Sequence, residues 1–256
     1  MSGTGSAFGE STWTRFGGAD PSSVVRRAGR EPFAGTPANC ALFDGIQPVD
    51  YSRILTLGRI REYTRGETLC VEGDPIQQVS LITAGAVKTI QVGSGGMEVI
   101  LRLSVPGDVI GALSLASTGR HCRTAQAFRM CRTLSWDAPV FRSLAERFPQ
   151  LHQNLLQIVR TDLRELEDRF REIATERVGV RLARQLTRLR DKIGQPVDGA
   201  IEIGLSREDL AQMTGTTLFT VSRVLSSWEA SGAISSRREA VVIRDFQSLL
   251  ALAGQS

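Results

Sequence analysis

The sequence has few of the residues on which most enzymes, metal proteins and secreted proteins depend. Its 256 residues include only four cysteines and two histidines. The cysteines are Cys40, Cys70, Cys122 and Cys131. They form no CxxC pair, so neither a disulfide framework nor a zinc site is indicated. There is no GxSxG, no P-loop and no metal-ligand spacing, and no nucleophile–base pair can be identified, so we do not expect an enzyme.

Long apolar runs are also missing. No stretch is long enough to span a bilayer, and residues 1–39 lack the apolar core of a signal peptide. We therefore expect a cytoplasmic localisation and no membrane partner. The net charge of +4 is only a mild bias towards anionic partners. A chain of 256 residues predicts about two domains, each able to bury a core.

The most informative stretch is residues 205–229, which predicts two short helices joined by a tight turn. Ser206 precedes the first helix and Asp209 follows three residues later, as in a capping box. Gly215 suits a left-handed turn, after which Thr216 or Thr217 caps the second helix. The inner faces carry Leu210, Ala211, Met213, Val221, Val224, Leu225 and Trp228. This is the pattern of a helix-turn-helix, in which the second helix enters the major groove. The alternative is an ordinary pair of helices in a helical domain.

Residues 59–137 have a different pattern, of short apolar segments separated by glycine and proline. The expected strands lie within residues 65–74, 79–83, 87–92, 97–103 and 123–136. Many short strands at this spacing predict a β-sandwich or a jelly-roll barrel. Before them we expect a short helix over residues 39–49 and a helix capped by Asp50. Residues 1–38 are rich in small and polar residues and are expected to form a flexible tail.

Residues 150–173 predict one long helix. Its apolar residues recur at alternating spacings of three and four, which is a heptad seam. The seam consists of Leu156, Val159, Leu163, Leu166, Phe170 and Ile173. It covers only about 2.5 heptads, which is short for a self-sufficient coiled coil. The alternative is therefore one amphipathic helix that packs on its own domain.

The rest of the C-terminal third predicts two more helices, a strand and a hairpin. A helix over residues 175–193 has an apolar inner stripe and an outer arginine stripe. The arginines are Arg177, Arg181, Arg184 and Arg188. They could approach phosphates, but we expect a solvated face. Residues 201–205 alternate as a strand, residues 233–243 predict a small hairpin with a basic tip, and residues 246–252 predict a short apolar helix that packs back.

Together these features resemble the Crp/Fnr family of bacterial transcription regulators over about residues 40–246. The glycine series resembles that of the cyclic-nucleotide-binding β-roll. It consists of Arg65-Gly66-Glu67, Glu72-Gly73-Asp74, Gly85, Gly107-Asp108 and Gly111. The resemblance implies an α+β fold with a jelly-roll-like sensor, a long dimerisation helix and a C-terminal winged helix-turn-helix. The implied domains are a tail (1–38), a sensor domain (39–149), the dimerisation helix (150–174) and a DNA-binding domain (175–256).

The resemblance also implies partners. A homodimer paired through the heptad seam would bind double-stranded DNA at a palindromic operator, and RNA polymerase is a candidate partner. Charge alone does not support DNA binding, because five arginines and five acidic residues balance from residue 206 to the end. The case for DNA binding therefore depends on where individual side chains lie. Arg223 lies opposite the inner face of the second helix, where contact with guanine is common.

Other residues of this module are candidate DNA contacts. Thr217 and Thr220 lie at the start of the second helix, where hydroxyls meet phosphate. Arg237 and Arg238 could clamp the DNA backbone, and Ser206 and Ser222 complete the candidate set. By resemblance, bases are read from Leu218, Phe219 and Arg223. Leu218 and Phe219 are apolar, whereas the best-known members have polar residues at these positions. The two side chains therefore either contact thymine methyl groups or pack within the domain, and the operator sequence stays open.

By resemblance, the sensor pocket falls on two short segments. Nucleotide-binding members use a Gly-Glu and a later Arg-Ser/Thr-Ala, which correspond here to Gly111-Ala112-Leu113 and Arg123-Thr124-Ala125. Ala112 replaces the carboxylate that accepts a ribose hydroxyl, and the adenine-contacting positions of the long helix fall on Leu166 and Glu167. We therefore do not expect cyclic AMP to be the effector. Arg123 can still bind an anion.

The cofactor stays unknown. An iron–sulfur cluster is not expected, because Cys40 is the one cysteine near the N-terminus. Haem is a lower-ranked alternative, since His121 and Cys122 lie near the end of the roll and His152 lies at the start of the long helix. Cys122 and Cys131 could form a redox pair, although scattered cysteines are usually inert core thiols. A regulator without an effector, or a ligand-binding module that docks on a protein partner, is the remaining alternative.

Overall fold

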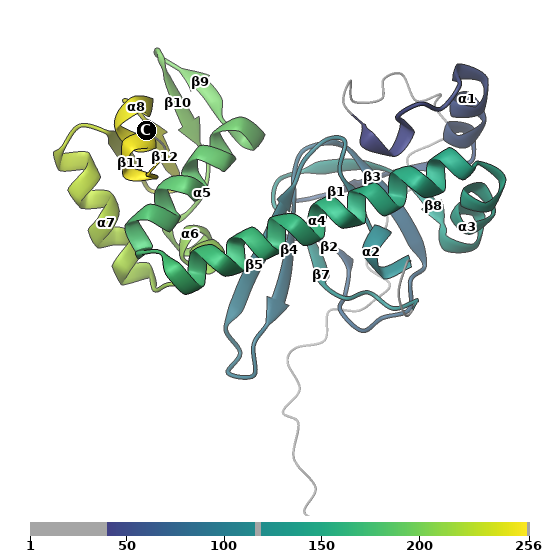
Figure 1. The fold of residues 1–256 in the computed structure, drawn as a ribbon, viewed down its shortest axis with the longest axis horizontal. Helices are drawn as coiled ribbons and strands as arrows, with labels where there is room; N and C mark the ends of the chain where they lie inside the picture. Colours follow the sequence, from purple (N-terminus) through teal and green to yellow (C-terminus); the bar gives the residue numbers. More distant parts are fainter. Residues whose placement is uncertain (1–39, 116–118, 255–256) are drawn as a thin grey trace, which may run out of the picture.

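The computed structural model describes residues 40–115 and 119–254, and the expected tail lies outside these ranges. A β-roll and a smaller helical domain are joined by one long helix, α4, which crosses the molecule (Figure 1). This arrangement confirms the predicted α+β class with a β-roll sensor, a long helix and a C-terminal helix-turn-helix. No helix among the described residues is both long and apolar enough to cross a membrane.

The roll consists of two antiparallel sheets of four strands each, with orders β1-β8-β3-β6 and β2-β7-β4-β5. Its strands are β1 (Arg59–Tyr63), β2 (Thr68–Cys70), β3 (Gln78–Ala84), β4 (Val87–Val92), β5 (Glu98–Ser104), β6 (Val109–Ile110), β7 (Thr124–Ala127) and β8 (Cys131–Asp137). Along β3, Val79 and Leu81 belong to one apolar cluster and Ile82 belongs to another. The four central residues of the strand, 79–82, are all buried because both faces of the strand are covered.

Three short helical elements pack against the β1-β8-β3-β6 sheet. They are the 3₁₀ turn η1 (Ala41–Phe43), α1 (Pro48–Thr56) and α3 (Ala138–Arg147). The indole of Trp136 is fully buried and donates a 2.8 Å hydrogen bond to the carbonyl of Ile54. The prediction of a helix over residues 39–49 is wrong, and Gln47 rather than Asp50 precedes α1. Proline suits the first position of a helix because its φ is already helical, so the helix begins at Pro48.

Helix α4 (Pro149–Thr175) has 27 residues and is about 40 Å long. Its first turns bury Leu151 and Leu155 in the core beneath η1. The amide of Asn154 donates hydrogen bonds of 3.0 and 2.8 Å to the carbonyls of Leu42 and Asp44. Another short helix, α2 (Ala112–Leu115), also contacts α4. The N-terminal part of α4 is therefore fixed to the roll, and its C-terminal part extends towards the smaller domain (Figure 1).

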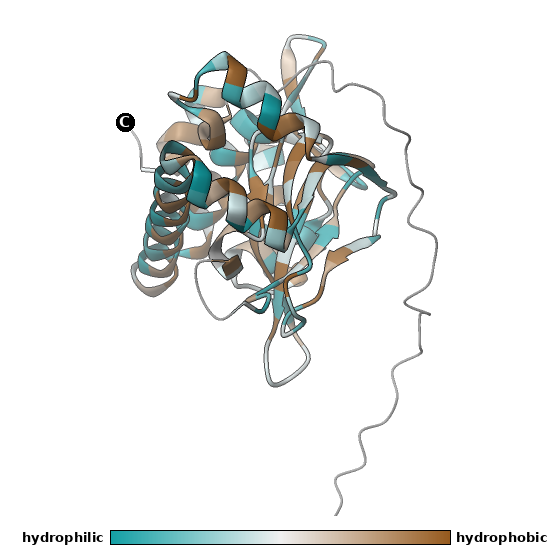
Figure 2. Ribbon diagram, turned by 90° about the vertical axis from the view of Figure 1, so that its right-hand side faces the viewer, coloured by the Kyte–Doolittle hydropathy of each residue, from teal (hydrophilic) through white to brown (hydrophobic). Residues whose placement is uncertain are grey.

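The C-terminal domain combines four helices and two hairpins around one core. Its elements are α5 (Val178–Ile193), β9 (Gln195–Val197), β10 (Ala200–Ile203), α6 (Arg207–Thr214), α7 (Leu218–Ala230), β11 (Ile234–Arg237), β12 (Ala240–Ile243) and α8 (Phe246–Leu252). The sheet order is β11-β12-β10-β9. The sequence reading missed β9 because Pro196 suggests a break, but an edge strand tolerates proline. Figure 2 shows hydrophobic and hydrophilic residues alternating around the helices, as expected for helices with one buried face.

Candidate functional site

The turn between α6 and α7 is built from local capping interactions. The backbone amide of Asp209 donates to the hydroxyl of Ser206 at 3.0 Å, and the amide of Ser206 donates to the Asp209 carboxylate at 3.1 Å. Gly215 adopts the left-handed conformation, with φ of 61°. Thr217 caps α7 by accepting a 3.2 Å hydrogen bond from the amide of Thr220. The predicted capping box and turn are thus confirmed, and the cap of α7 is Thr217 rather than Thr216.

Helix α7 has one buried and one exposed face. Val221 and Leu225 are fully buried in the domain core, together with most of Trp228. Arg223 is exposed on the opposite side. Leu218 and Phe219 at the start of the helix are 51% and 75% exposed. Most of Phe219 and about half of Leu218 are therefore open to an external contact.

The wing is held against α7 by side-chain contacts. The amide of Ser236 in β11 donates a 2.8 Å hydrogen bond to the carboxylate of Glu229 near the end of α7. The guanidinium of Arg237 pairs with Glu202 of β10. Arg237, a predicted contact of the DNA backbone, therefore has an acidic partner within the domain, and its side chain is still half-exposed. Arg238 is exposed at the tip of the hairpin.

The hydroxyls of the candidate set are used in different ways. That of Ser206 donates to the Asp209 carboxylate at 2.6 Å, so it belongs to the helix cap. Those of Thr217 and Thr220 lie 3.0 Å apart at the exposed N-terminal end of α7. Ser222 is half-buried on the same helix. Among the candidate DNA contacts of α6 and α7, those in the N-terminal turn of α7 and Arg223, one turn further on, are accessible to a ligand.

A cavity lies in the roll, between β5, α2, the segment before β7, and α4. Counting the open solvent at its mouth, it encloses about 460 Å³. Gly111, Ala112 and Arg123 of the predicted pocket line it. Thr124 and Leu166 do not, because the Thr124 hydroxyl accepts from the amide of Glu72 at 3.0 Å and Leu166 is exposed on α4. Leu113 lies in α2, between the lining residues Ala112 and Ser114.

The cavity contains an ionic cluster that motif reading missed. Arg102 of β5 pairs with Asp108 at 2.8 Å and with Asp162 of α4. Asp108 also accepts a 2.9 Å hydrogen bond from the amide of Val105. Burial, together with the charge of Arg102, lowers the pKa of Arg123 on the facing wall. A charged residue within the apolar run of β5 is the one sequence signal that points to this cluster.

The histidine and cysteine candidates have mostly buried positions. His121 is buried and lines the cavity, and burial lowers its pKa. Burial raises the pKa values of the Cys40, Cys70 and Cys131 thiols to about 11, so these residues are protonated at neutral pH. This supports the expectation of inert core thiols for these three cysteines. Among the described residues, no group of three or more His, Cys, Asp or Glu side chains could hold a metal ion.

The seam of α4 is mostly uncovered within the chain. Five of its six residues are exposed, and Phe170 is 73% exposed. These five are Leu156, Leu163, Leu166, Phe170 and Ile173. Val159 differs, because it is partly buried against the core of the roll. The alternative reading of α4, as a helix that packs wholly on its own domain, fails for the part of the helix beyond Asp162.

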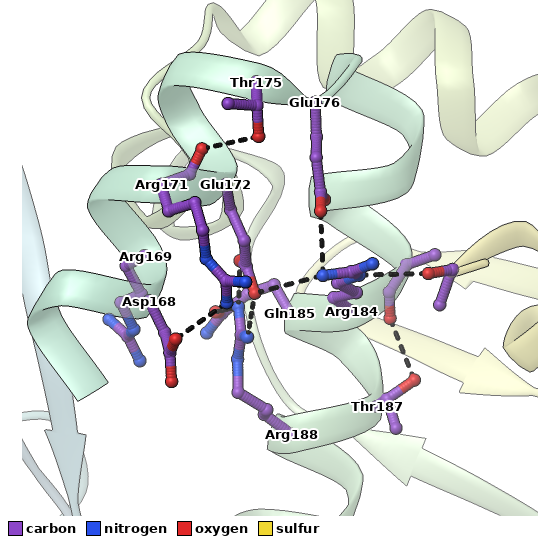
Figure 3. Close-up of polar contacts among 12 residues, drawn as sticks. Asp168, Arg169, Arg171, Glu172, Thr175, Glu176, Arg184, Gln185, Thr187 and Arg188 are labelled. Atoms are coloured by element: carbon purple, nitrogen blue, oxygen red, sulfur yellow. Dashed lines mark hydrogen bonds and ion pairs between the residues drawn. The ribbon is translucent and has the colours of Figure 1, made fainter. Parts of the chain in front are cut away.

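Three of the four arginines of the α5 stripe have partners within the chain, and Figure 3 shows two of them, Arg184 and Arg188, pointing towards the end of α4. Arg188 donates to both carboxylate oxygens of Glu172 at 2.7 and 2.9 Å. Arg184 pairs with Glu176 at 2.8 Å, and Arg181 donates to the carbonyl of Thr214. Burial acts to raise the pKa of Glu172, but Arg188 and Arg184 hold it below its ordinary value. The prediction of a solvated face is therefore wrong for these three arginines.

A β-roll with a polar cavity, a long helix with an exposed apolar seam, and a capped helix-turn-helix with a wing are the parts of a two-domain DNA-binding regulator. The sequence comparisons agree with this class. A family model described as a cyclic nucleotide-binding domain matches residues 60–148, and one described as a Crp-like helix-turn-helix domain matches residues 180–252.

Individual relatives match over most of their length. The CRP-like cAMP-activated global transcriptional regulator of Mycobacterium tuberculosis is 27% identical over 214 residues, which cover 83% of this chain and 96% of the relative. The global nitrogen regulator of Synechococcus elongatus is 30% identical over 190 residues, covering 72% and 85%. The structure of FixK2 from Bradyrhizobium japonicum has a TM-score of 0.67 at 27% identity, covering 76% of this chain and 96% of that one. The chain belongs to the Crp/Fnr family of transcription regulators.

Proposed function

We propose that this regulator acts as a homodimer on a palindromic operator, with α7 of each subunit in the major groove, and that its β-roll responds to an effector other than cyclic AMP. The division into a sensor (39–149), a dimerisation helix (150–174) and a DNA-binding domain (175–256) is part of the proposal. The observation that carries it is the capped, outward-facing α7, which exposes Arg223 one turn beyond Thr217 and Thr220 at the start of the helix. RNA polymerase is a further partner consistent with a transcription regulator.

The exposed seam of α4 supports the dimer. A row of large apolar side chains at heptad spacing on one helix is typical of a surface that is buried by a second copy. Pairing through this row would bring two α4 helices together and so place two α7 helices on one side of the dimer. Successive major grooves on one face of DNA are about 34–36 Å apart, and this distance is what the dimer must match.

The exposed face of α7 supports a specific type of half-site. Arg223 can donate two hydrogen bonds to O6 and N7 of guanine. Leu218 and Phe219 are exposed and have no polar group, so the base-edge feature that they can recognise is the C5-methyl group of thymine. We therefore propose that each half-site contains a guanine read by Arg223 next to thymines contacted by Leu218 and Phe219.

The cavity supports an effector other than cyclic AMP. The side chain at position 112 is a buried alanine methyl group, which cannot accept a hydrogen bond from a ribose hydroxyl. The α4 side of the cavity is taken up by the Arg102–Asp162 ion pair. The Mycobacterium tuberculosis relative is described as cAMP-activated. These two features make the same ligand a poor fit here.

The test is selection of bound sequences from a random DNA pool with the full-length protein, followed by affinity measurements at several salt concentrations. We expect a palindrome with guanine in each half-site. Arg223→Ala should weaken specific binding by about 1–3 kcal/mol and relax the preference at that guanine. Arg147→Ala, on an exposed position of α3 far along the chain from the interface, is the matched control. If no sequence is enriched, or if Arg223→Ala binds the selected site like the wild type, the proposal is wrong.

A further inference from the structure

The exposed face of α7 places an aromatic ring beside a guanidinium. Phe219 is 75% exposed, and Arg223 follows it four residues later on the same helix. Side chains at this spacing lie on one face of a helix, about one turn apart. Val221 and Leu225 supply the packing on the buried side, so the phenyl ring of Phe219 is not needed for the core. The two exposed side chains can therefore act together on a ligand.

The spacing of Phe219 and Arg223 matches that of neighbouring base pairs. Cβ atoms four residues apart on a helix are about 5–6 Å from each other, and successive bases of one strand are about 3.4 Å apart. When Arg223 donates to O6 and N7 of a guanine, Phe219 therefore reaches the next base pair. The apolar group that a base pair presents in the major groove is the C5-methyl group of its pyrimidine.

The C5-methyl group does not identify a single base. Thymine carries it next to the O4 acceptor, whereas 5-methylcytosine carries it at the same ring position next to the N4 amino donor. A protein separates these two bases through a side chain whose hydrogen-bonding character is fixed. A phenyl ring has no such group, so contact with Phe219 alone favours both bases equally over uracil and cytosine.

The hydroxyl groups around Phe219 do not make the distinction either. Those of Thr217 and Thr220 lie 3.0 Å apart, and that of Thr217 accepts the amide of Thr220. Ser222 and Ser226 are the serines nearest to this end of α7. A hydroxyl can donate or accept, so it suits the O4 of thymine and the N4 of cytosine alike.

The other side chains of α7 with fixed hydrogen-bonding character are already placed elsewhere. Trp228 is buried in the domain core. Glu229 accepts a 2.8 Å hydrogen bond from the amide of Ser236 in the wing. Glu229 is also ten residues, or about 15 Å, beyond Phe219 along the helix. Within α7, Arg223 is thus the side chain of fixed character that faces the same way as Phe219, and its donors suit the neighbouring guanine.

We propose that Phe219 reads the pyrimidine C5-methyl group beside the guanine bound by Arg223, and that it accepts 5-methylcytosine in place of thymine. Cytosine methylation of such a site then raises the affinity of the regulator for it. The inference rests on the proposed function, since it requires α7 in the major groove, and it gives the chemical feature by which α7 selects its site.

The experiment uses four duplexes built on the operator that is selected from the random pool. The thymine beside the guanine in each half-site is kept, or is replaced by uracil, 5-methylcytosine or cytosine. Thymine and uracil are paired with adenine, and the two cytosines with guanine, so each pair of duplexes differs by the methyl group alone. Loss of one methyl contact should weaken binding about fourfold, and loss of both in the palindrome about 15-fold. The thymine and 5-methylcytosine duplexes should bind within about threefold of each other.

Variants show whether Phe219 is the reader. Phe219→Ala should bind the methylated and unmethylated duplexes of each pair within twofold. Met130→Ala removes an equally exposed apolar side chain from the roll and should keep the full methyl preference. Arg223→Ala should lose the preference for guanine but keep a preference for the methyl group.

The proposal is wrong if removal of the methyl group from either pair leaves affinity unchanged, or if Phe219→Ala keeps the wild-type preference. It is also wrong if thymine is favoured over 5-methylcytosine more than fivefold, because another side chain would then read O4. An operator without a thymine beside the guanine overturns it as well. Each of these results leaves a selected palindrome in hand, and with it the proposed DNA-binding function. Only the failure to select any sequence removes both.

Discussion

The proposed DNA contacts on α6 and α7 lie within one short stretch, whereas the charged residues of the cavity come from three distant parts of the chain. The caps, the turn and the exposed Arg223 all fall between residues 206 and 223. Arg102 belongs to β5, Arg123 precedes β7, and Asp162 belongs to α4. The first region depends on helix geometry that is set by neighbouring residues. The second exists only when the roll has closed against α4.

This difference has a consequence for how each region can vary. Residues at the start of α7 can change without disturbing the core, because Leu218 and Phe219 are exposed while Val221 and Leu225 supply the packing. A change at Arg102 or Asp162 leaves a buried charge without its partner. The proposed DNA-reading face can therefore change without loss of the core, whereas the cavity is coupled to the position of α4.

The largest expected effect is at the seam that links the two regions. Replacing Leu163 and Leu166 by glutamate puts four charges into the proposed interface of a dimer, so sedimentation should show monomers. Operator affinity should fall by about 100-fold, because two linked half-site contacts become one. Arg164→Glu, also exposed on α4 but outside the seam, is the control. A double variant that still sediments as a dimer would mean that the interface lies elsewhere.

The next effect concerns the contact of α4 with α5. Glu172 is 5% exposed and bonded through both oxygens to Arg188, so Glu172→Gln leaves a partly buried arginine without its anion. We expect a loss of about 2 kcal/mol in the free energy of unfolding, below the range for fully buried pairs because Arg188 is partly exposed. Denaturant unfolding measures it. Asp168→Asn, which breaks an exposed pair with Arg171, should cost less than about 0.5 kcal/mol.

The same pair predicts a pH dependence. The pKa of Glu172 is lower in the folded protein than its ordinary value of 4.5, so its contribution to stability is fully present above that value. The contribution is lost as the pH falls through the folded-state pKa. The difference in unfolding free energy between the wild type and Glu172→Gln should therefore be constant at neutral pH and shrink below about pH 4.5. A difference that persists at lower pH would contradict the role of the carboxylate charge.

A smaller effect tests the local construction of the helix-turn-helix. Gly215 has φ of 61°, and a β-carbon there would contact only Ile173 at ordinary van der Waals distance. Gly215→Ala should therefore cost the backbone strain alone, about 1–2 kcal/mol. Thermal unfolding of the full-length protein measures this change. A loss of much more than this would show that the turn also depends on packing against α4.

The smallest expected effect is that of cyclic AMP. Because Ala112 cannot accept a ribose hydroxyl, titration with cyclic AMP should leave the midpoint of thermal unfolding unchanged, whereas a bound ligand at 100 times its Kd adds about 2.7 kcal/mol of stability. A saturable rise in the midpoint would contradict the effector proposal. It would leave the helix-turn-helix prediction as it is.

Patterns with a local cause were predicted well from the sequence. The β-strand over residues 87–92 and the helix over residues 246–252 agree with β4 and α8, since Gly and Asp set their ends. The helix predicted over residues 39–49 is in fact only the short 3₁₀ turn η1 and the start of α1, and β9 was missed because Pro196 suggests a break. The arginine stripe of α5 was misread, because helical periodicity indicates an outer face but not the acidic residues of α4 that cover it.

The amino-acid sequence by itself determined the class of fold, the capped turn before α7 and the outward face that carries Arg223. The turn and the face depend on residues within one or two helical turns of one another, and the class of fold follows from the order of such local patterns along the chain. Only the tertiary structure decided that Arg102 meets Asp162, that Arg237 pairs with Glu202, and that Glu172 holds α5 against α4. These are pairs of charges far apart in the chain. An ion pair of that kind has no periodicity, and its partners are selected by which surfaces the apolar cores bring together.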